Sequence, residues 1–265
     1  MKKEIRLDKY LSQVSGESRN EVKGWLKKGR VTVNQEKERD PGRKICPEED
    51  RITLDGRSLT HHRYHYLMLH KPAGLVSATR DDRERTVLDL ILNEEASHRW
   101  NEDPFGMAAY SEVFPVGRLD KDTEGLLLLT DDGDLSHQLL SPRKHVTKCY
   151  FALLDGRTGR EEEEAFAQGL DIGDEKKTLP AGLRPASAEE CEKEYSGEIR
   201  GYGVYITIEE GRYHQVKRMA RAVGREVLYL KRVSMGGLRL DPDLQAGCCR
   251  PLTEEELELL QSGRS

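Results

Sequence analysis

The spacing of hydrophobic residues over the first sixty positions predicts two short helices followed by small strands. Residues 7–14 place Leu, Tyr, Leu and Val at positions i, i+3, i+4 and i+7, which form one face of a helix. Ser18, with Glu21 three positions later, is typical of a capping box and predicts the start of a second helix. Hydrophobic residues that alternate with polar ones at 31–34 and 51–54 predict two strands. These elements together predict a small separate module.

From residue 66 onward, strand and helix patterns follow one another without a regular strand–helix–strand rhythm. Strands are expected at 66–69, 126–129, 148–154 and 204–209. Helices are expected at 86–91, 134–140, 161–169 and 214–223, and the polar residues 93–112 are expected to form a loop. This succession favours an α+β domain with a mixed, mostly antiparallel central sheet flanked by helices.

Length and composition indicate a globular protein with much polar surface. The chain has 265 residues, of which 36% are hydrophobic and 34% are charged, and this length allows two domains. No apolar run approaches the roughly 18 residues that span a bilayer, and no apolar segment follows the charged start of the chain. The five cysteines include no CxxC pair and are expected to be reduced structural thiols. We therefore expect a cytoplasmic protein with no membrane partner.

The net charge of −5 argues against a nucleic-acid binder, but the distribution of charge changes that picture. Residues 1–34 hold nine basic and four acidic side chains, and a second basic cluster occupies 212–232. In the second expected helix, Arg19, Lys23 and Lys27 are four positions apart and line one face, which we term the basic ridge. An ordinary solvated helix face is the alternative interpretation. Two helices this short and this basic favour RNA binding.

The N-terminal module resembles the S4 RNA-binding domain in three segments. They are Ile5-Arg6-Leu7-Asp8-Lys9-Tyr10-Leu11, Ser18-Arg19-Asn20-Glu21-Val22 and Gly29-Arg30-Val31-Thr32-Val33-Asn34. The resemblance implies an αL-type RNA-binding fold over residues 1–60, in which the helix pair docks on structured RNA, and a catalytic domain over residues 61–265. The basic residues expected to contact RNA are Arg6, Lys9, Arg19, Lys23, Lys27 and Arg30.

The segment 117–125 carries the strongest chemical signal of the chain. It places Asp120 two residues after Arg118 on a short loop that leads into the apolar run 126–129. A loop braced by a rigid strand is a common position for reactive groups. Taken alone, an Asp on a loop is more often structural or solvated. The role of Asp120 therefore depends on residues elsewhere in the chain.

Two other clusters resemble parts of metal sites, and both lack the full pattern. Asp120, Asp122 and the acids of 131–134 lack the Glu that a calcium-binding loop places several residues after its Gly. The three histidines within 61–65 have no Cys or carboxylate pattern beside them. No metal site is therefore predicted.

Four motifs, in order along the chain, resemble those of the pseudouridine synthases of the RsuA/RluA superfamily. They are Leu69-x-Lys71-Pro72-x-Gly74, the run from Gly117-Arg118-Leu119-Asp120 to Thr130-x-Asp132-Gly133, Lys148-x-Tyr150, and Glu210-Gly211-Arg212-Tyr213-His214-Gln215-Val216-Lys217-Arg218-Met219. Together with the S4 module, the resemblance covers residues 4–258. It implies an isomerase that extrudes a uridine from RNA, detaches its base and reattaches the base through carbon 5.

The resemblance also implies roles for individual residues. Asp120 would be the nucleophilic carboxylate that acts at C1′ of the ribose, and Lys217 would pair with it where many relatives have Arg. A nearby cation and the positive end of a helix dipole both favour the ionised carboxylate that attack requires. Tyr150 would stack on the target base, and Arg118 would occupy the space that the extruded nucleotide leaves. Further RNA contacts are expected from Arg212 and Arg218.

These observations predict a monomeric rRNA pseudouridine synthase without a cofactor, because the isomerisation has no redox step and the chain has no P-loop or GxGxxG. Segments 210–219 and 249–256 resemble most closely the enzymes that act on 16S rRNA. Both naked RNA and an assembling ribosomal particle stay open as the form of the substrate. The first alternative is a 23S rRNA enzyme of the RluB/RluE/RluF type. The others are a non-catalytic RNA-binding ribosome-assembly protein and a carboxylate-based nucleoside glycosidase.

Overall fold

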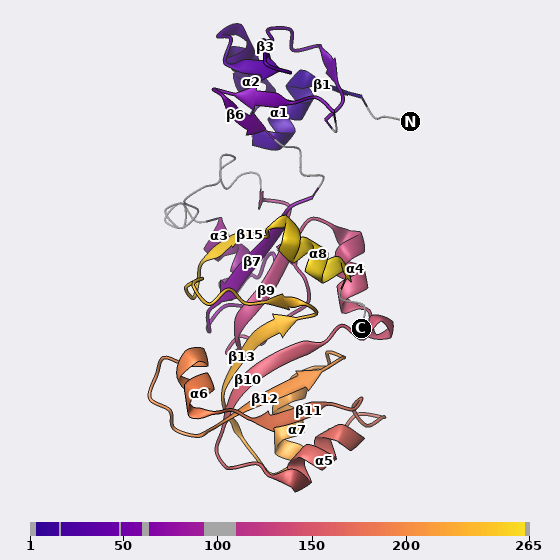
Figure 1. The fold of residues 1–265 in the computed structure, drawn as a ribbon, viewed down its shortest axis with the longest axis vertical. Helices are drawn as coiled ribbons and strands as arrows, with labels where there is room; N and C mark the ends of the chain where they lie inside the picture. The colour runs from indigo at the N-terminus through magenta and orange to yellow at the C-terminus, as the bar shows by residue number, and fades with distance from the viewer. Residues whose placement is uncertain (1–3, 16, 48, 60–63, 93–109, 263–265) are drawn as a thin grey trace. The chain divides into compact units, whose positions relative to one another are not determined.

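The computed structural model describes residues 4–15, 17–47, 49–59, 64–92 and 110–262. The chain divides into two compact units, residues 1–65 with 92–113 and residues 66–91 with 114–265, and each is described by itself (Figure 1). The domain boundary predicted after residue 60 falls outside the described residues and stays a prediction. Most of the loop expected at 93–112 lies outside them as well.

The described part of the first unit contains two helices and two small sheets. Its elements are β1 (Ile5–Arg6), α1 (Leu7–Ser15), α2 (Arg19–Lys27), β2 (Val31–Val33), β3 (Glu36–Lys37), β4 (Lys44–Ile45), β5 (Ile52–Leu54) and β6 (Arg57–Leu59). Strands β3-β2-β5-β6 form an antiparallel sheet in that order, and β1 pairs with β4. The two predicted helices and the strands predicted at 31–34 and 51–54 are confirmed. Ser18 Oγ accepts the N–H of Glu21 at 3.3 Å, so the predicted N-terminal cap of α2 is present.

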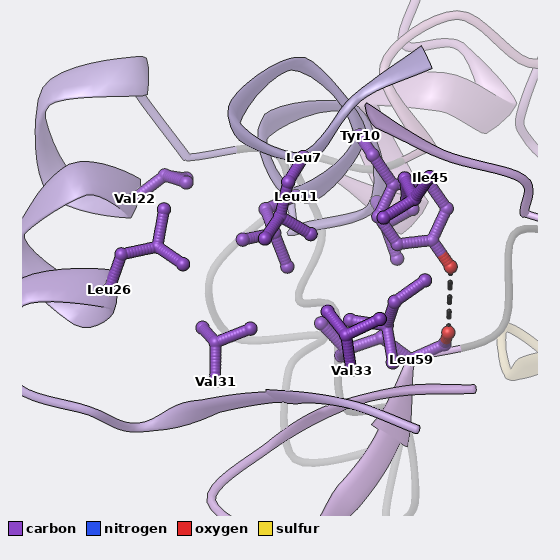
Figure 2. Packing of buried hydrophobic residues seen from close by; sticks show 11 residues of the cluster. Leu7, Tyr10, Leu11, Val22, Leu26, Val31, Val33, Ile45 and Leu59 are labelled. Atoms are coloured by element: carbon purple, nitrogen blue, oxygen red, sulfur yellow. Dashed lines mark hydrogen bonds between the residues drawn. The ribbon is translucent and has the colours of Figure 1, made fainter. Parts of the chain in front are cut away.

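Helical spacing explains the core of this unit, which Figure 2 shows from close by. One face of each helix packs over the strands through buried side chains that include Leu7, Tyr10, Leu11, Val22, Leu26, Val31, Val33, Ile45 and Leu59. Burial of one such aliphatic side chain contributes roughly 1.5–3 kcal/mol, so this small module has its own hydrophobic stabilisation. Tyr10 Oη donates a hydrogen bond of 2.7 Å to the carbonyl of Leu59, which ties α1 to β6.

The described part of the second unit contains a nine-stranded sheet. Its strands are β7 (Tyr66–Lys71), β8 (Phe114–Pro115), β9 (Glu124–Thr130), β10 (Lys148–Leu154), β11 (Gly182–Pro185), β12 (Tyr202–Ile208), β13 (Val227–Met235), β14 (Leu238–Arg239) and β15 (Cys249–Pro251). The order is β11-β12-β10-β13-β9-β7-β15, with β14 on β13 and β8 on β9. Strands β9 and β13 run parallel, and the other neighbours run antiparallel. The predicted mixed, mostly antiparallel sheet is therefore confirmed.

Helices flank this sheet, as predicted for the α+β class (Figure 1). They are α3 (Val87–Ile91), α4 (Gly133–Leu140), the 3-10 helix η3 (Pro142–Lys144), α5 (Arg160–Gln168), α6 (Ala188–Glu194), α7 (Gln215–Ala222) and α8 (Glu254–Ser262). Leu139 of α4 and Leu260 of α8 share a buried cluster with Met68 of β7 and Leu128 of β9. The helices expected at 86–91, 134–140, 161–169 and 214–223 correspond to α3, α4, α5 and α7. The elements of this unit that had not been predicted are β8, β11, β13, β14, β15, α6, η3 and α8.

Gly125 allows the two halves of the sheet to meet. It follows Glu124 in the parallel pairing of β9 with β13, lies opposite Arg232, and has a φ of +103°. A Cβ atom at this position would lie 2.2 Å from the carbonyl oxygen of Arg232, a distance that the backbone does not tolerate. Only a glycine therefore fits here without displacing a strand. The loop with Asp120 ends at this crossing.

Two further features of the fold concern the cysteines and the helices. None of the five cysteines forms a disulfide. In the described part of the chain, no helix is long and apolar enough to cross a membrane.

Candidate active site

The sheet register brings two of the motifs together. Gly125 on β9 lies opposite Arg232 on β13, and Arg232 lies opposite Tyr150 on β10. Asp120 is on the loop that leads into β9, five residues before Gly125. Tyr150 is buried. Three adjacent strands thus carry the acid loop and the predicted base-stacking tyrosine to the same part of the sheet.

Asp120 is flanked by two nitrogen groups from the start of α7. Its Oδ2 lies 3.4 Å from Nζ of Lys217, and its Oδ1 lies 3.5 Å from Nε2 of His214. The Asp120 side chain is 26% exposed and the Lys217 side chain 19%, so both remain partly open to solvent. The predicted pairing of Asp120 with Lys217 is present as a contact in the structure.

Lys217 has a second carboxylate partner that sequence reasoning did not anticipate. Its Nζ donates to Oδ1 of Asp122 at 2.5 Å. Partial burial opposes ionisation of Asp122, but this hydrogen bond holds the pKa of the Asp122 carboxyl below its usual value. One ammonium group therefore fixes two carboxylates of the same loop.

The first turn of α7 explains why Lys217 and His214 reach Asp120. Lys217 is the third residue of α7, where the helix dipole places positive potential. His214 precedes the helix with φ 48° and ψ 36°, the left-handed region that non-glycine residues seldom adopt. The amide of buried Gln215 holds this turn, because its Oε1 accepts the N–H of Arg212 and its Nε2 donates to Glu210.

A buried lysine braces the Asp120 loop from the inside. The Lys71 side chain is fully buried, and its Nζ lies within hydrogen-bond distance of four backbone carbonyls. They belong to Pro72 at 3.0 Å, Asp120 at 3.2 Å, Lys121 at 3.3 Å and Thr123 at 2.8 Å. Burial lowers the pKa of the Lys71 ammonium to about 8, although three nearby carboxylates act in the opposite direction. The Lys71 ammonium thus holds the backbone of Asp120, the nucleophile candidate, and of the residues that follow it.

Further hydrogen bonds hold the same loop. Ser77 Oγ donates to the carbonyl of Leu119 and accepts its N–H, each at 3.0 Å. The N–H of Gly74 donates to the carbonyl of Lys121 at 2.7 Å. Groups positioned by such interactions are suited to catalysis because they need little rearrangement during reaction.

The other predicted site residues of this unit differ in their surroundings. Arg118 is exposed and has no hydrogen bond or ion pair to any described residue. Arg212 donates to the carbonyls of Lys176 and Lys177, at 2.7 and 2.8 Å. Arg218 donates to the carbonyl of Ile172 and pairs with Asp174. Both Arg212 and Arg218 thus hold the loop before β11, and their RNA contacts stay a prediction.

The basic ridge lies on the exposed face of α2, with Arg19, Lys23 and Lys27 all exposed. Lys9 is exposed on α1. Arg6 pairs with buried Asp8 at 3.0 Å, and Arg30 pairs with Asp55 and lies 5.7 Å from the Trp25 ring centre. Two of the six predicted contacts are therefore already paired within the module, whereas the ridge residues have no hydrogen bond or ion pair to any described residue.

Comparison with known proteins decides the family. The family model described as RNA pseudouridylate synthase matches residues 65–222, and the S4 domain model matches residues 5–52. The chain belongs to the RNA pseudouridylate synthase family. As a pseudouridine synthase it is an isomerase, and its N-terminal S4 domain is an RNA-binding module.

Relatives of this synthase match over nearly the whole chain. Uncharacterized RNA pseudouridine synthase YtzG of Bacillus subtilis is 44% identical over 97% of this chain and 98% of its own. Ribosomal small subunit pseudouridine synthase A of Escherichia coli is 40% identical over 96% of this chain and 98% of its own. A crystal structure of pseudouridylate synthase, 33% identical, covers 97% of this chain and 99% of its own with a TM-score of 0.61.

Three residues of the synthase site were missed by sequence reasoning. Lys71 had been assigned to a strand–turn motif without a role, His214 had been left out of the site, and Ser77 had not been noted. The Lys-Pro pair of the first motif was the one available signal for Lys71, because a lysine within an apolar strand has to find buried acceptors. Nothing in the local sequence indicated that His214 would adopt a left-handed backbone conformation beside Asp120.

The metal predictions can be compared with the described residues only. Among them, no group of three or more His, Cys, Asp or Glu side chains is arranged to hold a metal ion. His61 and His62 lie outside the described residues. The carboxylates of Asp120 and Asp122 instead share the ammonium of Lys217.

Proposed function

We propose that this pseudouridine synthase converts a uridine of ribosomal RNA, in 16S rRNA, to pseudouridine, with Asp120 as the nucleophile. The observation that carries the proposal is the contact of 3.4 Å between Asp120 Oδ2 and Lys217 Nζ, on a loop that Lys71 braces from below. A fixed cation keeps a carboxylate ionised and aimed without reorganisation during the reaction.

In this mechanism the C1′–N1 bond of the target uridine breaks as Asp120 acts at C1′. The released uracil turns, a C5–C1′ bond forms, the proton on C5 leaves and N1 gains a proton. The proton that C5 loses is balanced by the proton that N1 gains, so pseudouridine has the composition of uridine and no redox partner or hydrolytic water is consumed. Tyr150 stacks on the turning base, and Arg118 enters the space that the extruded nucleotide leaves.

RNA recognition is divided between the units in this proposal. The S4 module contributes its basic ridge to the phosphate backbone, and the synthase unit contributes the chemistry. The 16S target is supported by 40% identity to the Escherichia coli enzyme named for the ribosomal small subunit. The cytoplasmic location and the monomeric state predicted from the sequence belong to the same proposal.

The test compares rRNA from cells with the protein, without it, and with an Asp120→Asn variant. Pseudouridine is mapped on 16S and 23S rRNA by carbodiimide treatment and blocked reverse transcription. We expect one 16S position to lose its signal without the protein and in Asp120→Asn, because removal of a nucleophile lowers rates on the order of 10⁴-fold or more. Asp134→Asn, an equally isosteric change at an exposed residue of α4, should keep the signal.

Other outcomes identify the alternatives. A change confined to 23S rRNA would move the substrate to the large subunit. Intact cellular function in Asp120→Asn would favour a non-catalytic assembly protein. Release of free uracil from RNA by the purified protein would indicate a glycosidase instead of an isomerase.

A further inference from the structure

Tyr213 is the most exposed of the large hydrophobic residues that lie exposed in the described part of the chain, with 78% of its surface open. A single exposed aromatic residue on a protein surface needs no functional explanation by itself. The surroundings of Tyr213 supply one, because it directly precedes His214 and α7.

The Tyr213 ring stacks on the imidazole of His214. The ring centres are 3.9 Å apart and the planes differ by 18°, so His214 covers one face of the tyrosine ring. His214 also places its Nε2 3.5 Å from Oδ1 of Asp120. A continuous path of contacts therefore runs from the nucleophile candidate through one imidazole to an exposed aromatic surface.

The backbone beneath this stack is fixed on both sides. The carbonyl of Tyr213 accepts a hydrogen bond of 3.1 Å from Nη1 of Arg218. The N–H of Arg212 donates to the buried amide of Gln215 at 2.9 Å. A rigid aromatic surface loses little conformational freedom when a ligand stacks on it, which is how aromatic anchors gain affinity.

The acidic groups near this turn are compensated. Asp122 pairs with Lys217, Asp174 pairs with Arg218, and Glu210 pairs with Arg212. A phosphate backbone that approaches the stack therefore meets carboxylates whose charge is already offset.

We propose that Tyr213 is the stacking platform for a nucleobase that neighbours the target uridine in the RNA strand. The proposal rests on the proposed function, because it places the target base at Asp120. The open face of the ring takes that neighbouring base, and His214 sets the position of the ring relative to the nucleophile. Every base has a π-face, so the platform orders an unpaired strand without selecting its sequence.

The test is a binding measurement that does not depend on the isomerisation. The probes are two single-stranded RNA heptamers with a central uridine, one with 2-aminopurine on its 5′ side and one with 2-aminopurine on its 3′ side. Each is titrated with the full chain, and the fluorescence of 2-aminopurine, which stacking on an aromatic ring quenches, is recorded. Wild type and Asp120→Asn should both quench one of the two probes.

Tyr213→Ala should lose this quenching and bind that probe roughly five- to a hundredfold more weakly, the effect of removing one base–aromatic stack. Tyr213→Phe keeps the ring and should stay within about threefold of wild type. Tyr202→Ala is the matched control, since Tyr202 is another exposed tyrosine, at the start of β12, and should bind like wild type. A probe with an abasic nucleotide in place of the 2-aminopurine carries no fluorophore, so its binding is measured by filter binding; it should bind wild type as weakly as Tyr213→Ala binds the intact probe.

Two results would overturn the platform: no quenching with wild type on either probe, or equal quenching with Tyr213→Ala. The results also distinguish a failure of the platform proposal from a failure of the proposed function. If quenching depends on Tyr213 while no rRNA position depends on the protein, the proposed function fails and the platform stands. If pseudouridine forms and Tyr213→Ala has wild-type kcat/KM and quenching, the platform alone fails.

Discussion

The Asp120 loop and the basic ridge of α2 carry charge in opposite ways. Around the loop, Lys71 of β7 is fully buried and its ammonium faces four backbone carbonyls, while Lys217 of α7 contacts Asp120 and Asp122. On the ridge, Arg19, Lys23 and Lys27 are exposed and have no hydrogen bond or ion pair to any described residue. The cations around the loop hold its backbone and carboxylates in position, whereas the cations of the ridge are exposed and available to a ligand.

This difference follows from what each region has to do. A nucleophile works only in a narrow range of positions, and misplacement by about 1 Å can cost on the order of a hundredfold in rate. Attraction to an RNA backbone acts over roughly 8 Å at physiological ionic strength and tolerates flexible side chains. We therefore expect changes in the loop to alter rate and stability, and changes in the ridge to alter affinity and its salt dependence.

Among the changes that test this comparison, Lys71→Met should have the largest effect. Without the ammonium, the carbonyls of Asp120, Lys121 and Thr123 lose a buried donor, and the loop loses its position. We expect kcat for pseudouridine formation to fall roughly a hundredfold or more. The free energy of unfolding should fall by roughly 2–4 kcal/mol, with RNA affinity little changed. Single-turnover rates, urea denaturation and filter binding measure the three quantities.

Lys121→Met is the matched stability control for this loop. The Lys121 side chain is half exposed and pairs with Glu84 at 2.7 Å. An exposed pair of this kind contributes about 0–1 kcal/mol, so this variant should unfold much like wild type. Equal stability losses in the two lysine variants would show that the buried ammonium does not brace the loop.

The ridge should give a smaller effect of a different kind. Replacing Arg19, Lys23 and Lys27 by Ala removes three exposed cations without disturbing the buried face of α2. Each lost phosphate contact lowers the slope of log affinity against log salt by about 0.7–0.9, so the slope should fall by about 2–3. With RNA at saturation, kcat should stay within about twofold of wild type.

Alanine changes at three exposed residues on the outer face of α5 would provide a control in the synthase unit; Arg160, Glu161 and Glu164 are suitable. They should leave the salt slope unchanged. A ridge variant whose salt slope equals that of wild type would mean that α2 does not face RNA, whatever its charge. The same binding measurement can be made on a variant that lacks residues 1–60. This deletion should weaken RNA binding more than it lowers the rate of the chemistry with RNA at saturation.

Much of this comparison could be predicted from the sequence, because hydrophobic periodicity is local. It located α1, α2, β9, β10, β12 and α7, and the ordered motifs predicted that Asp120 and Lys217 would meet. It missed β13, whose run of apolar residues is interrupted by Lys231 and Arg232. In the fold Arg232 is buried and its Nε donates to the carbonyl of Leu126, a partner more than a hundred residues away.

The missed part of the site has the same origin. Lys71 finds its acceptors about fifty residues further along the chain, so no local pattern shows that its ammonium is satisfied. His214 lies beside Asp120 with a left-handed backbone conformation, which no local pattern indicated. Local sequence predicts elements and their faces, whereas buried polar partners depend on how distant strands come together.

The smallest expected effect concerns a second buried lysine, Lys148, two residues before Tyr150. Burial, with a contribution from nearby Arg232, lowers the pKa of the Lys148 ammonium to about 8, against about 10.4 for an unfolded lysine. Between these values the unfolded chain binds more protons than the folded one, so stability rises with pH. Relative to Lys148→Met, wild type should gain on the order of 1 kcal/mol between pH 7 and pH 9. Urea denaturation across this range measures the difference, and Lys23→Met corrects for the loss of one positive charge. If the difference in unfolding free energy between wild type and Lys148→Met does not change with pH, the Lys148 ammonium is solvated in the folded protein. Water would then reach the strand that carries Tyr150 more readily than it reaches the loop that Lys71 braces.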